Sequence, residues 1–81
     1  MRLDKYLKVS RIIKRRTVAN EACDAGRVVV NGKVAKAGFE VKPGDIMEIG
    51  MGGKVLKAEI LIVAENTRKE DAAAMYKIIS G

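Results

Sequence analysis

The sequence predicts an α+β fold, in which two short N-terminal helices pack on a small antiparallel sheet and a further helix closes the C-terminal end. Three observations support this prediction. Apolar residues recur with a helical period over the first 25 residues, and short β-branched runs alternate with turn signals from residue 27. The helical period returns after residue 67. Because the chain has 81 residues, it is expected to form a single domain, 1–81.

The first helix is expected over about residues 3–9. Within it, Leu3, Tyr6 and Leu7 have the i, i+3, i+4 spacing of one helical face. Asp4 lies in the first turn, where a negative charge compensates the positive end of the helix dipole. The same carboxylate could instead orient a neighbouring arginine, and the sequence leaves both interpretations open.

The second helix is expected over about residues 18–25, with Thr17 as its N-cap. Small side chains recur at helical spacing on one face of this helix, and the last of them is Cys23. They would let the two helices approach closely. Gly26 then provides a left-handed position at which the helix can end.

From residue 27 the pattern is that of strands. Residues 28–30 and 33–35 flank Asn31 and Gly32, a pair that tolerates the positive φ angles of a tight hairpin turn. The further expected elements are a turn at 42–45, a strand at 46–49, a glycine-rich hairpin tip at 50–53 and the longest strand at 55–63.

The C-terminal helix is expected over residues 68–79. Thr67 and Glu70 have the spacing of a capping box, in which each side chain accepts a hydrogen bond from a free backbone N–H group of the helix start. The residues expected on the buried face of this helix are Ala72, Met75, Tyr76 and Ile79. Tyr6 and Tyr76 are expected to be core residues whose hydroxyl groups reach water.

The positive charge of the chain, +6 in total, lies in its first half. Residues 1–37 carry ten Lys/Arg against three Asp/Glu, a net of +7, whereas residues 38–81 carry six against seven, a net of −1. The densest stretch, residues 11–17, contains four Lys/Arg. Such a one-sided surplus is typical of a protein that binds a polyanion.

Catalysis by this chain is not expected. There is no histidine, the single cysteine has no histidine partner, and the acidic residues are scattered. No glycine-rich phosphate or dinucleotide motif fits, and a lone thiol makes neither a zinc site nor an intrachain disulfide. We therefore expect no metal and no cofactor. Neither a signal peptide nor a membrane span is apparent, so a cytoplasmic location without membrane contact is expected.

Five local features resemble, in order and spacing, the RNA-binding domain named after small-subunit ribosomal protein S4. They are the run RLDKYL at 2–7, the basic loop that ends in RRT at 15–17, the small-residue helix, GRVVVNG at 26–32 and VKPGD at 41–45. The resemblance covers about residues 1–50, with further strands and the closing helix at 51–81. It implies the αL RNA-binding motif of this family, which acts as an RNA clamp. The functional arginines of the family fall on Arg2 and Arg16.

Over nearly its full length, the chain resembles a bacterial family of ribosome-associated quality control factors. The opening residues 1–11, the run at 13–17 and the ending at 73–78 carry this resemblance. It implies binding to large-subunit rRNA and to peptidyl-site tRNA, on an obstructed large ribosomal subunit with a stalled nascent chain. It also implies assistance to a partner, RqcH, in adding C-terminal alanine tails. Nothing in the sequence demands a dimer, so a monomer is expected.

The residues expected to bind RNA are Arg2, Lys5, Lys8, Arg11, Lys14, Arg15, Arg16, Thr17, Arg27 and Lys36. Arginine suits this role because its planar fork donates two hydrogen bonds to one phosphate. Only three aromatic residues are present, and they form no stacking array. This favours binding to the shape and backbone of structured RNA over binding to splayed bases.

Simpler interpretations of these residues remain. A run of charges is usually a solvated surface, and Thr17 can serve only as a helix cap. Arg27 and Lys36 flank a hairpin whose turn has a structural explanation, so neither residue needs to contact RNA. Three other functions are considered as well. The first is recycling of stalled large subunits in the manner of a heat-shock relative, the second is a general structured-RNA or DNA-binding module, and the third is an enzyme subunit that uses a partner's catalytic groups.

Overall fold

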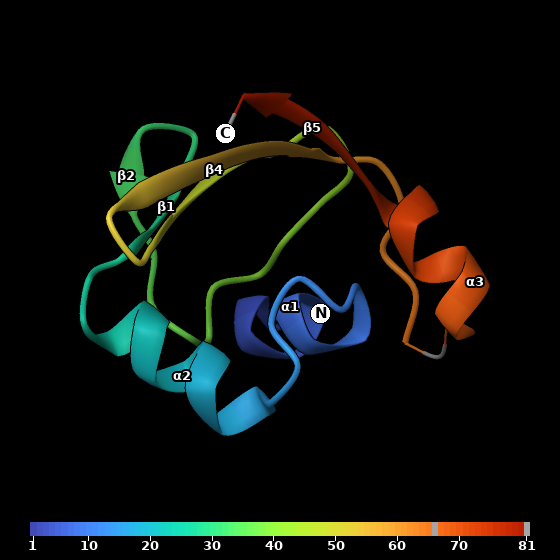
Figure 1. The fold of residues 1–81 in the computed structure, drawn as a ribbon, viewed down its shortest axis with the longest axis horizontal. Helices are drawn as coiled ribbons and strands as arrows, with labels where there is room; N and C mark the ends of the chain where they lie inside the picture. Colours follow the sequence, from blue (N-terminus) through green and yellow to red (C-terminus); the bar gives the residue numbers. More distant parts are fainter. Residues whose placement is uncertain (66, 81) are drawn as a thin grey trace.

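The computed structural model describes residues 1–65 and 67–80. Its elements, in chain order, are α1 (Leu3–Val9), α2 (Arg16–Asp24), β1 (Val28–Val30), β2 (Lys33–Val34), β3 (Ile46–Met51), β4 (Lys54–Ile60), α3 (Lys69–Ala72), the 3-10 helix η1 (Ala73–Met75) and β5 (Tyr76–Ser80) (Figure 1). Within the described residues, no helix has the length and apolar character needed to cross a membrane.

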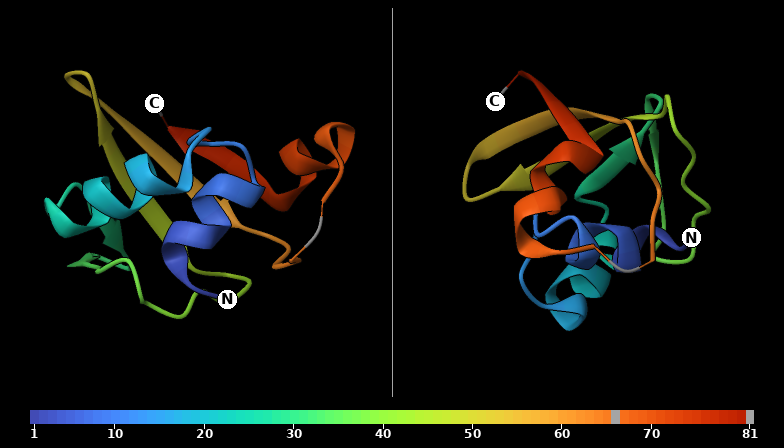
Figure 2. Two further views of the ribbon diagram at one scale, coloured as in Figure 1. Left: turned by 90° about the horizontal axis from the view of Figure 1, so that it is seen from below. Right: turned by 90° about the vertical axis from the view of Figure 1, so that its right-hand side faces the viewer.

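The five strands form one antiparallel sheet in the order β2-β1-β3-β4-β5, so β2 and β5 are its edges. The β1–β2 hairpin turns at Asn31 and Gly32, whose φ angles of 52° and 83° are the positive values that the Asn-Gly pair predicts. Helices α1 and α2 lie side by side on one face of the sheet (Figure 2). The α+β fold class is therefore confirmed.

A single hydrophobic cluster joins the helices to the inner face of the sheet. From α1, Leu3, Tyr6 and Leu7 are fully buried, as their spacing predicts. From α2, the buried residues are the small Ala19 and Cys23, which let the two helices approach closely. The sheet contributes alternate residues of its strands, namely Val28, Val30, Met47, Ile49, Ala58 and Ile60. Burial of this cluster fixes α1 and its charged flanks against the sheet.

The C-terminal helix is much shorter than predicted. Helix α3 covers only Lys69–Ala72, and residues 76–79, which the sequence assigned to the same helix, belong to strand β5. The apolar spacing of this segment suits either structure, whereas the β-branched Ile78 and Ile79 favour a strand. Strand β5 pairs antiparallel with β4, on the side of β4 that does not pair with β3. In addition, β4 ends at Ile60 rather than at residue 63.

Neither predicted helix cap is formed. Helix α2 begins one residue before Thr17, and its N-cap residue, Arg15, makes no side-chain capping bond. The N-cap of α3 is Arg68, so the predicted capping box is also wrong. The hydroxyl group of Thr67 instead lies 3.3 Å from the sulfur of Met75. Both helices therefore start without a side-chain capping bond from their N-cap residue.

Tyr6 links α1 to the C-terminal segment. Its hydroxyl group is buried and donates a hydrogen bond of 2.8 Å to the backbone carbonyl of Met75. The expectation that this hydroxyl reaches water was therefore wrong. Burial raises the pKa of the Tyr6 phenol, and the nearby Tyr76 adds to the effect. The phenol stays neutral and acts as a structural donor.

Candidate nucleic-acid interface

A buried carboxylate holds two arginines where α1 and α2 begin. The side chain of Asp4 is only 3% exposed, and Nε of Arg2 donates to its Oδ1 at 3.2 Å. Nε of Arg16 donates to Oδ2 of the same carboxylate at 3.4 Å. The Arg2 and Arg16 side chains nevertheless remain 55% and 48% exposed. One buried acid therefore fixes the direction of two arginines that are still open to solvent.

Two further donors complete the hydrogen bonding of Asp4. They are Nδ2 of Asn20 at 3.3 Å and the backbone N–H of Lys5 at 2.8 Å. Burial alone would raise the pKa of Asp4, but the hydrogen bonds from Asn20 and Lys5 and the charges of Arg16 and Arg2 outweigh it and lower that pKa. Asp4 therefore stays ionised at neutral pH, and its bonds to the arginines are charge-assisted. Asp4 could have compensated the helix dipole or oriented a neighbouring arginine, and the structure shows that it orients two arginines.

Arg2 and Arg16 line an open groove of about 460 Å³, which we call the arginine groove. The other residues that line it are Asp4, Thr17, Asn20 and Glu21. Thr17, predicted as an RNA contact, thus lies beside the two arginines. A pair of guanidinium groups with fixed directions along an open surface is suited to the phosphates of a nucleic-acid strand.

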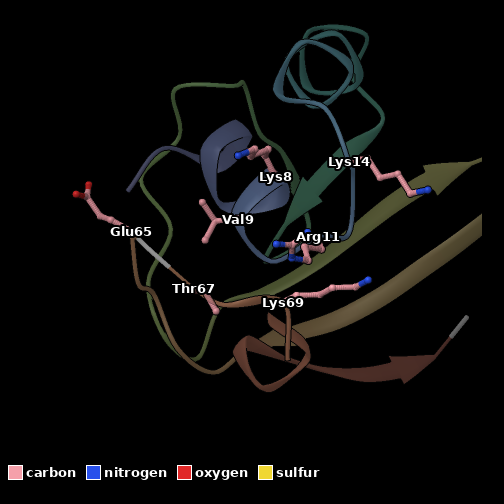
Figure 3. Close-up of a pocket in the computed structure, with 7 residues that line it drawn as sticks. All are labelled: Lys8, Val9, Arg11, Lys14, Glu65, Thr67 and Lys69. Atoms are coloured by element: carbon pink, nitrogen blue, oxygen red, sulfur yellow. The ribbon is translucent and has the colours of Figure 1, made fainter. Parts of the chain in front are cut away.

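A second basic surface lies beyond the C-terminal end of α1. It is a hollow of about 620 Å³, which we call the lysine hollow, lined by Lys8, Val9, Arg11, Lys14, Glu65, Thr67 and Lys69 (Figure 3). Lys8, Arg11 and Lys14 were predicted as RNA contacts, but Lys69 was not. Lys69 belongs to the half of the chain that carries no positive surplus, and only the return of the chain past α1 places it here.

The other predicted residues line neither surface. Nζ of Lys5 lies 3.4 Å from Oε1 of Glu65, so this lysine makes an ion pair. Arg15 is exposed directly before α2, and Lys36 is exposed in the loop between β2 and β3. Arg27 lines a separate hollow of about 540 Å³ at the β3–β4 turn. The sequence thus identified the basic residues but not their division among distinct surfaces.

The single cysteine has no role at these surfaces. Cys23 is fully buried in α2, and this burial raises the pKa of its thiol to about 11, with Asp4 and Asp24 adding to the shift. A buried thiol with so high a pKa is a poor nucleophile at neutral pH. Among residues 1–65 and 67–80, there is no group of three or more His, Cys, Asp or Glu residues placed to hold a metal ion.

Comparison with known proteins identifies the family. Residues 1–47 match the S4 domain family. Over 80 residues, the chain is 59% identical to the RQC P-site tRNA stabilizing factor of Streptococcus pneumoniae, which covers 99% of this chain and 91% of that protein. The chain belongs to the family of RQC P-site tRNA stabilizing factors, RqcP. The RqcP of Halalkalibacterium halodurans is 56% identical over 78 residues, which cover 96% of this chain and 89% of that protein.

The fold is shared with a solved structure. The trimeric structure of Vibrio cholerae Heat Shock Protein 15 matches with a TM-score of 0.91 and 27% sequence identity, over 99% of this chain and 82% of that one. The match extends to the C-terminal segment, beyond the residues that define the S4 domain. The sequence-based resemblance to the S4 and RqcP families is thereby confirmed.

Proposed function

We propose that this protein stabilises a peptidyl-site tRNA during ribosome-associated quality control, as the name of the RqcP family states for its relatives. It binds both tRNA and large-subunit rRNA on obstructed large ribosomal subunits that carry a stalled nascent chain. There it assists RqcH in adding C-terminal alanine tails. It works in the cytoplasm as a monomer, without catalysis, and residues 1–81 act as one unit.

The observation that carries this proposal is the arginine groove. Arg2 and Arg16 are each bonded to the buried Asp4, so less conformational freedom is lost when they bind phosphate. Tyr6 is buried, Tyr76 is partly buried and Phe39 is 38% exposed, so aromatic side chains offer little platform for stacked bases. Recognition of the RNA backbone, whose phosphates are arranged by the fold of tRNA, is therefore favoured.

The similarity to Heat Shock Protein 15 favours a second candidate, the recycling of stalled large subunits without a role in tailing. The two functions differ in their dependence on RqcH. If alanine tails on stalled chains disappear when this protein is deleted and return with the wild-type chain, the first function holds. Unchanged tailing, together with an accumulation of obstructed subunits, would favour recycling.

A sucrose gradient tests the proposal. A tagged copy of the protein is expected to migrate with free large subunits that carry peptidyl-tRNA. Arg16→Ala should move the protein to the top of the gradient, whereas the matched control Lys77→Ala, on the edge strand β5, should migrate like the wild type. Migration of the wild-type protein away from every ribosomal fraction would refute the proposal.

A further inference from the structure

We infer that the lysine hollow is a second RNA-binding site, which takes the ribose-phosphate backbone and uses Lys69 as a contact from the C-terminal half of the chain. This inference rests on the proposed RNA-binding function. It assigns that function an additional surface, separate from the arginine groove, and a residue that the charge pattern of the sequence does not indicate.

The hollow carries a positive charge that the protein does not compensate. Lys8, Arg11, Lys14 and Lys69 are all exposed, and within the described parts of the chain none of the four makes an ion pair. The one carboxylate at the hollow, Glu65, is paired with Lys5, and in Figure 3 it points away from the four cationic groups. Because like charges repel, a bound anion would relieve this cluster.

The segment that carries Lys69 is anchored to the rest of the fold through Met75. The backbone carbonyl of Met75 accepts the Tyr6 hydroxyl at 2.8 Å and also the N–H groups of Leu61 at 2.8 Å and Ile62 at 3.1 Å. The hydroxyl of Thr67 lies 3.3 Å from the sulfur of Met75. The Tyr6 bond ties Met75 to α1, and the other bonds tie it to residues 61, 62 and 67. Lys69 therefore lies on a segment that hydrogen bonds hold in the fold, and not on a free tail.

The backbone at Arg11 also indicates use of its side chain. Arg11 has a φ angle of 63°, a left-handed conformation that is uncommon outside glycine. Its N–H donates to the carbonyl of Lys8 at 3.1 Å, and that of Ile13 donates to Leu7 at 3.1 Å, so the chain turns sharply after α1. Glycine would adopt this conformation at no steric cost. An arginine at this strained position, lining the hollow, is typical of a functional residue.

The residues that line the hollow indicate what kind of ligand it binds. Four cationic side chains line it, and this number suits a stretch of backbone with more than one phosphate. Val9 provides an apolar wall suited to a ribose, and among the residues that the structure describes no aromatic side chain lines the hollow to stack a base. Binding at this site is therefore independent of sequence and depends strongly on salt.

The test compares two double variants that each remove two lysine charges. Lys14→Gln/Lys69→Gln changes the hollow. Lys57→Gln/Lys77→Gln is the matched control on the sheet, where Lys57 pairs in register with Glu48 and Lys77 with Glu59. The affinity of each protein for a fluorescently labelled, folded tRNA is measured by anisotropy at several KCl concentrations.

The hollow variant is expected to lose about tenfold in affinity at low salt. Its plot of log K against log salt should be shallower by about 0.9 for each duplex phosphate that the variant no longer neutralises. The control should keep the slope of the wild type. Equal losses in the two double variants would overturn the inference, because they would reflect net charge alone. Stronger competition by poly-glutamate than by unlabelled RNA would also overturn it, in favour of an acidic peptide.

Failure of this inference can be distinguished from failure of the proposed function. If the wild type binds tRNA and Arg16→Ala abolishes binding, while the hollow variant behaves like the control, only the second site is refuted. If the wild-type protein does not bind tRNA at all, the proposed function and this inference fall together. Circular dichroism of each variant checks that the fold is retained.

Discussion

The arginine groove and the lysine hollow, at opposite ends of α1, carry positive charge in different ways. In the groove, Arg2 and Arg16 are both bonded to the buried Asp4. In the hollow, four exposed cations line an open space, and among the residues the structure describes none of them is ion-paired. The groove therefore provides donors with set directions, and the hollow provides an electrostatic field. The difference indicates that the groove recognises the positions of phosphate groups, whereas the hollow attracts the negative charge of RNA.

The largest expected effect is on stability, through the acid beneath the groove. Asp4→Asn is expected to lower the free energy of unfolding at neutral pH by about 1–3 kcal/mol, because several hydrogen bonds to a buried charge are weakened. The folded-state pKa of Asp4 is lowered, so its contribution is present above the ordinary carboxyl pKa and is lost as the pH falls through the folded-state value. In urea unfolding, the gap between wild type and variant should therefore narrow in acid. A gap that does not change with pH would contradict this role.

The second prediction exchanges arginine for lysine at each surface. Arg16→Lys should weaken tRNA binding about tenfold, or ~1.4 kcal/mol, because lysine lacks both the Nε that bonds Asp4 and the planar fork. Arg11→Lys should change the affinity by less than about twofold, because the hollow needs only a charge. Equilibrium binding to the same tRNA measures both. If the two variants lost tRNA affinity to the same extent, the groove and the hollow would not differ in their need for arginine.

The third prediction concerns the bond that places Lys69. Tyr6→Phe deletes the hydrogen bond to the Met75 carbonyl and should cost about 1 kcal/mol of stability. Hydrogen exchange is expected to speed up in residues 61–65 and 67–75 and to stay unchanged in α2. The salt slope of tRNA binding should become shallower, because the segment that carries Lys69 loses its hydrogen bond to α1. The bonds of Arg2 and Arg16 to Asp4 are not affected. Uniformly faster exchange across the whole chain would show instead that Tyr6 supports only global stability.

The smallest expected effect has opposite signs for stability and for binding. Arg11→Gly should raise the free energy of unfolding by about 0.5 kcal/mol, because glycine relieves the positive φ angle. It should also weaken tRNA binding, because one charge of the hollow is removed. Chemical denaturation and anisotropy on the same protein test both signs. A loss of stability would mean that the Arg11 side chain supports the fold.

Elements with local signals were predicted well from the sequence. Helix α1 has the expected bounds, Leu3–Val9, because its buried face and its charged residues alternate at helical spacing. The Asn31 and Gly32 turn follows from the conformational freedom of those two residues. Most basic residues of the candidate site were also identified, because their clustering is visible in the order of the sequence, whereas Lys69 was not.

Features that depend on distant contacts were not predicted. Strand β5 forms by pairing with β4, which precedes it in the chain by a helix and a loop, and no short window of sequence contains that pairing. The bond between Arg16 and Asp4 spans 12 residues, and that between Tyr6 and Met75 spans 69. The arrangement of the arginines and the position of Lys69 depend on these contacts. The charge pattern of the sequence therefore identified most of the basic residues, and the tertiary fold decided which of them lie together.

One binding measurement tests the central claim, that Asp4 holds the arginines of the groove in a geometry that RNA requires. Asp4→Asn removes a negative charge, so electrostatics alone predicts tighter binding to a polyanion such as tRNA. Our account predicts weaker binding, by about tenfold, with an unchanged salt slope, because both arginines remain but lose their fixed direction. Anisotropy is measured under conditions in which the variant is fully folded. Affinity for folded tRNA that is equal to or higher than that of the wild type would contradict the account.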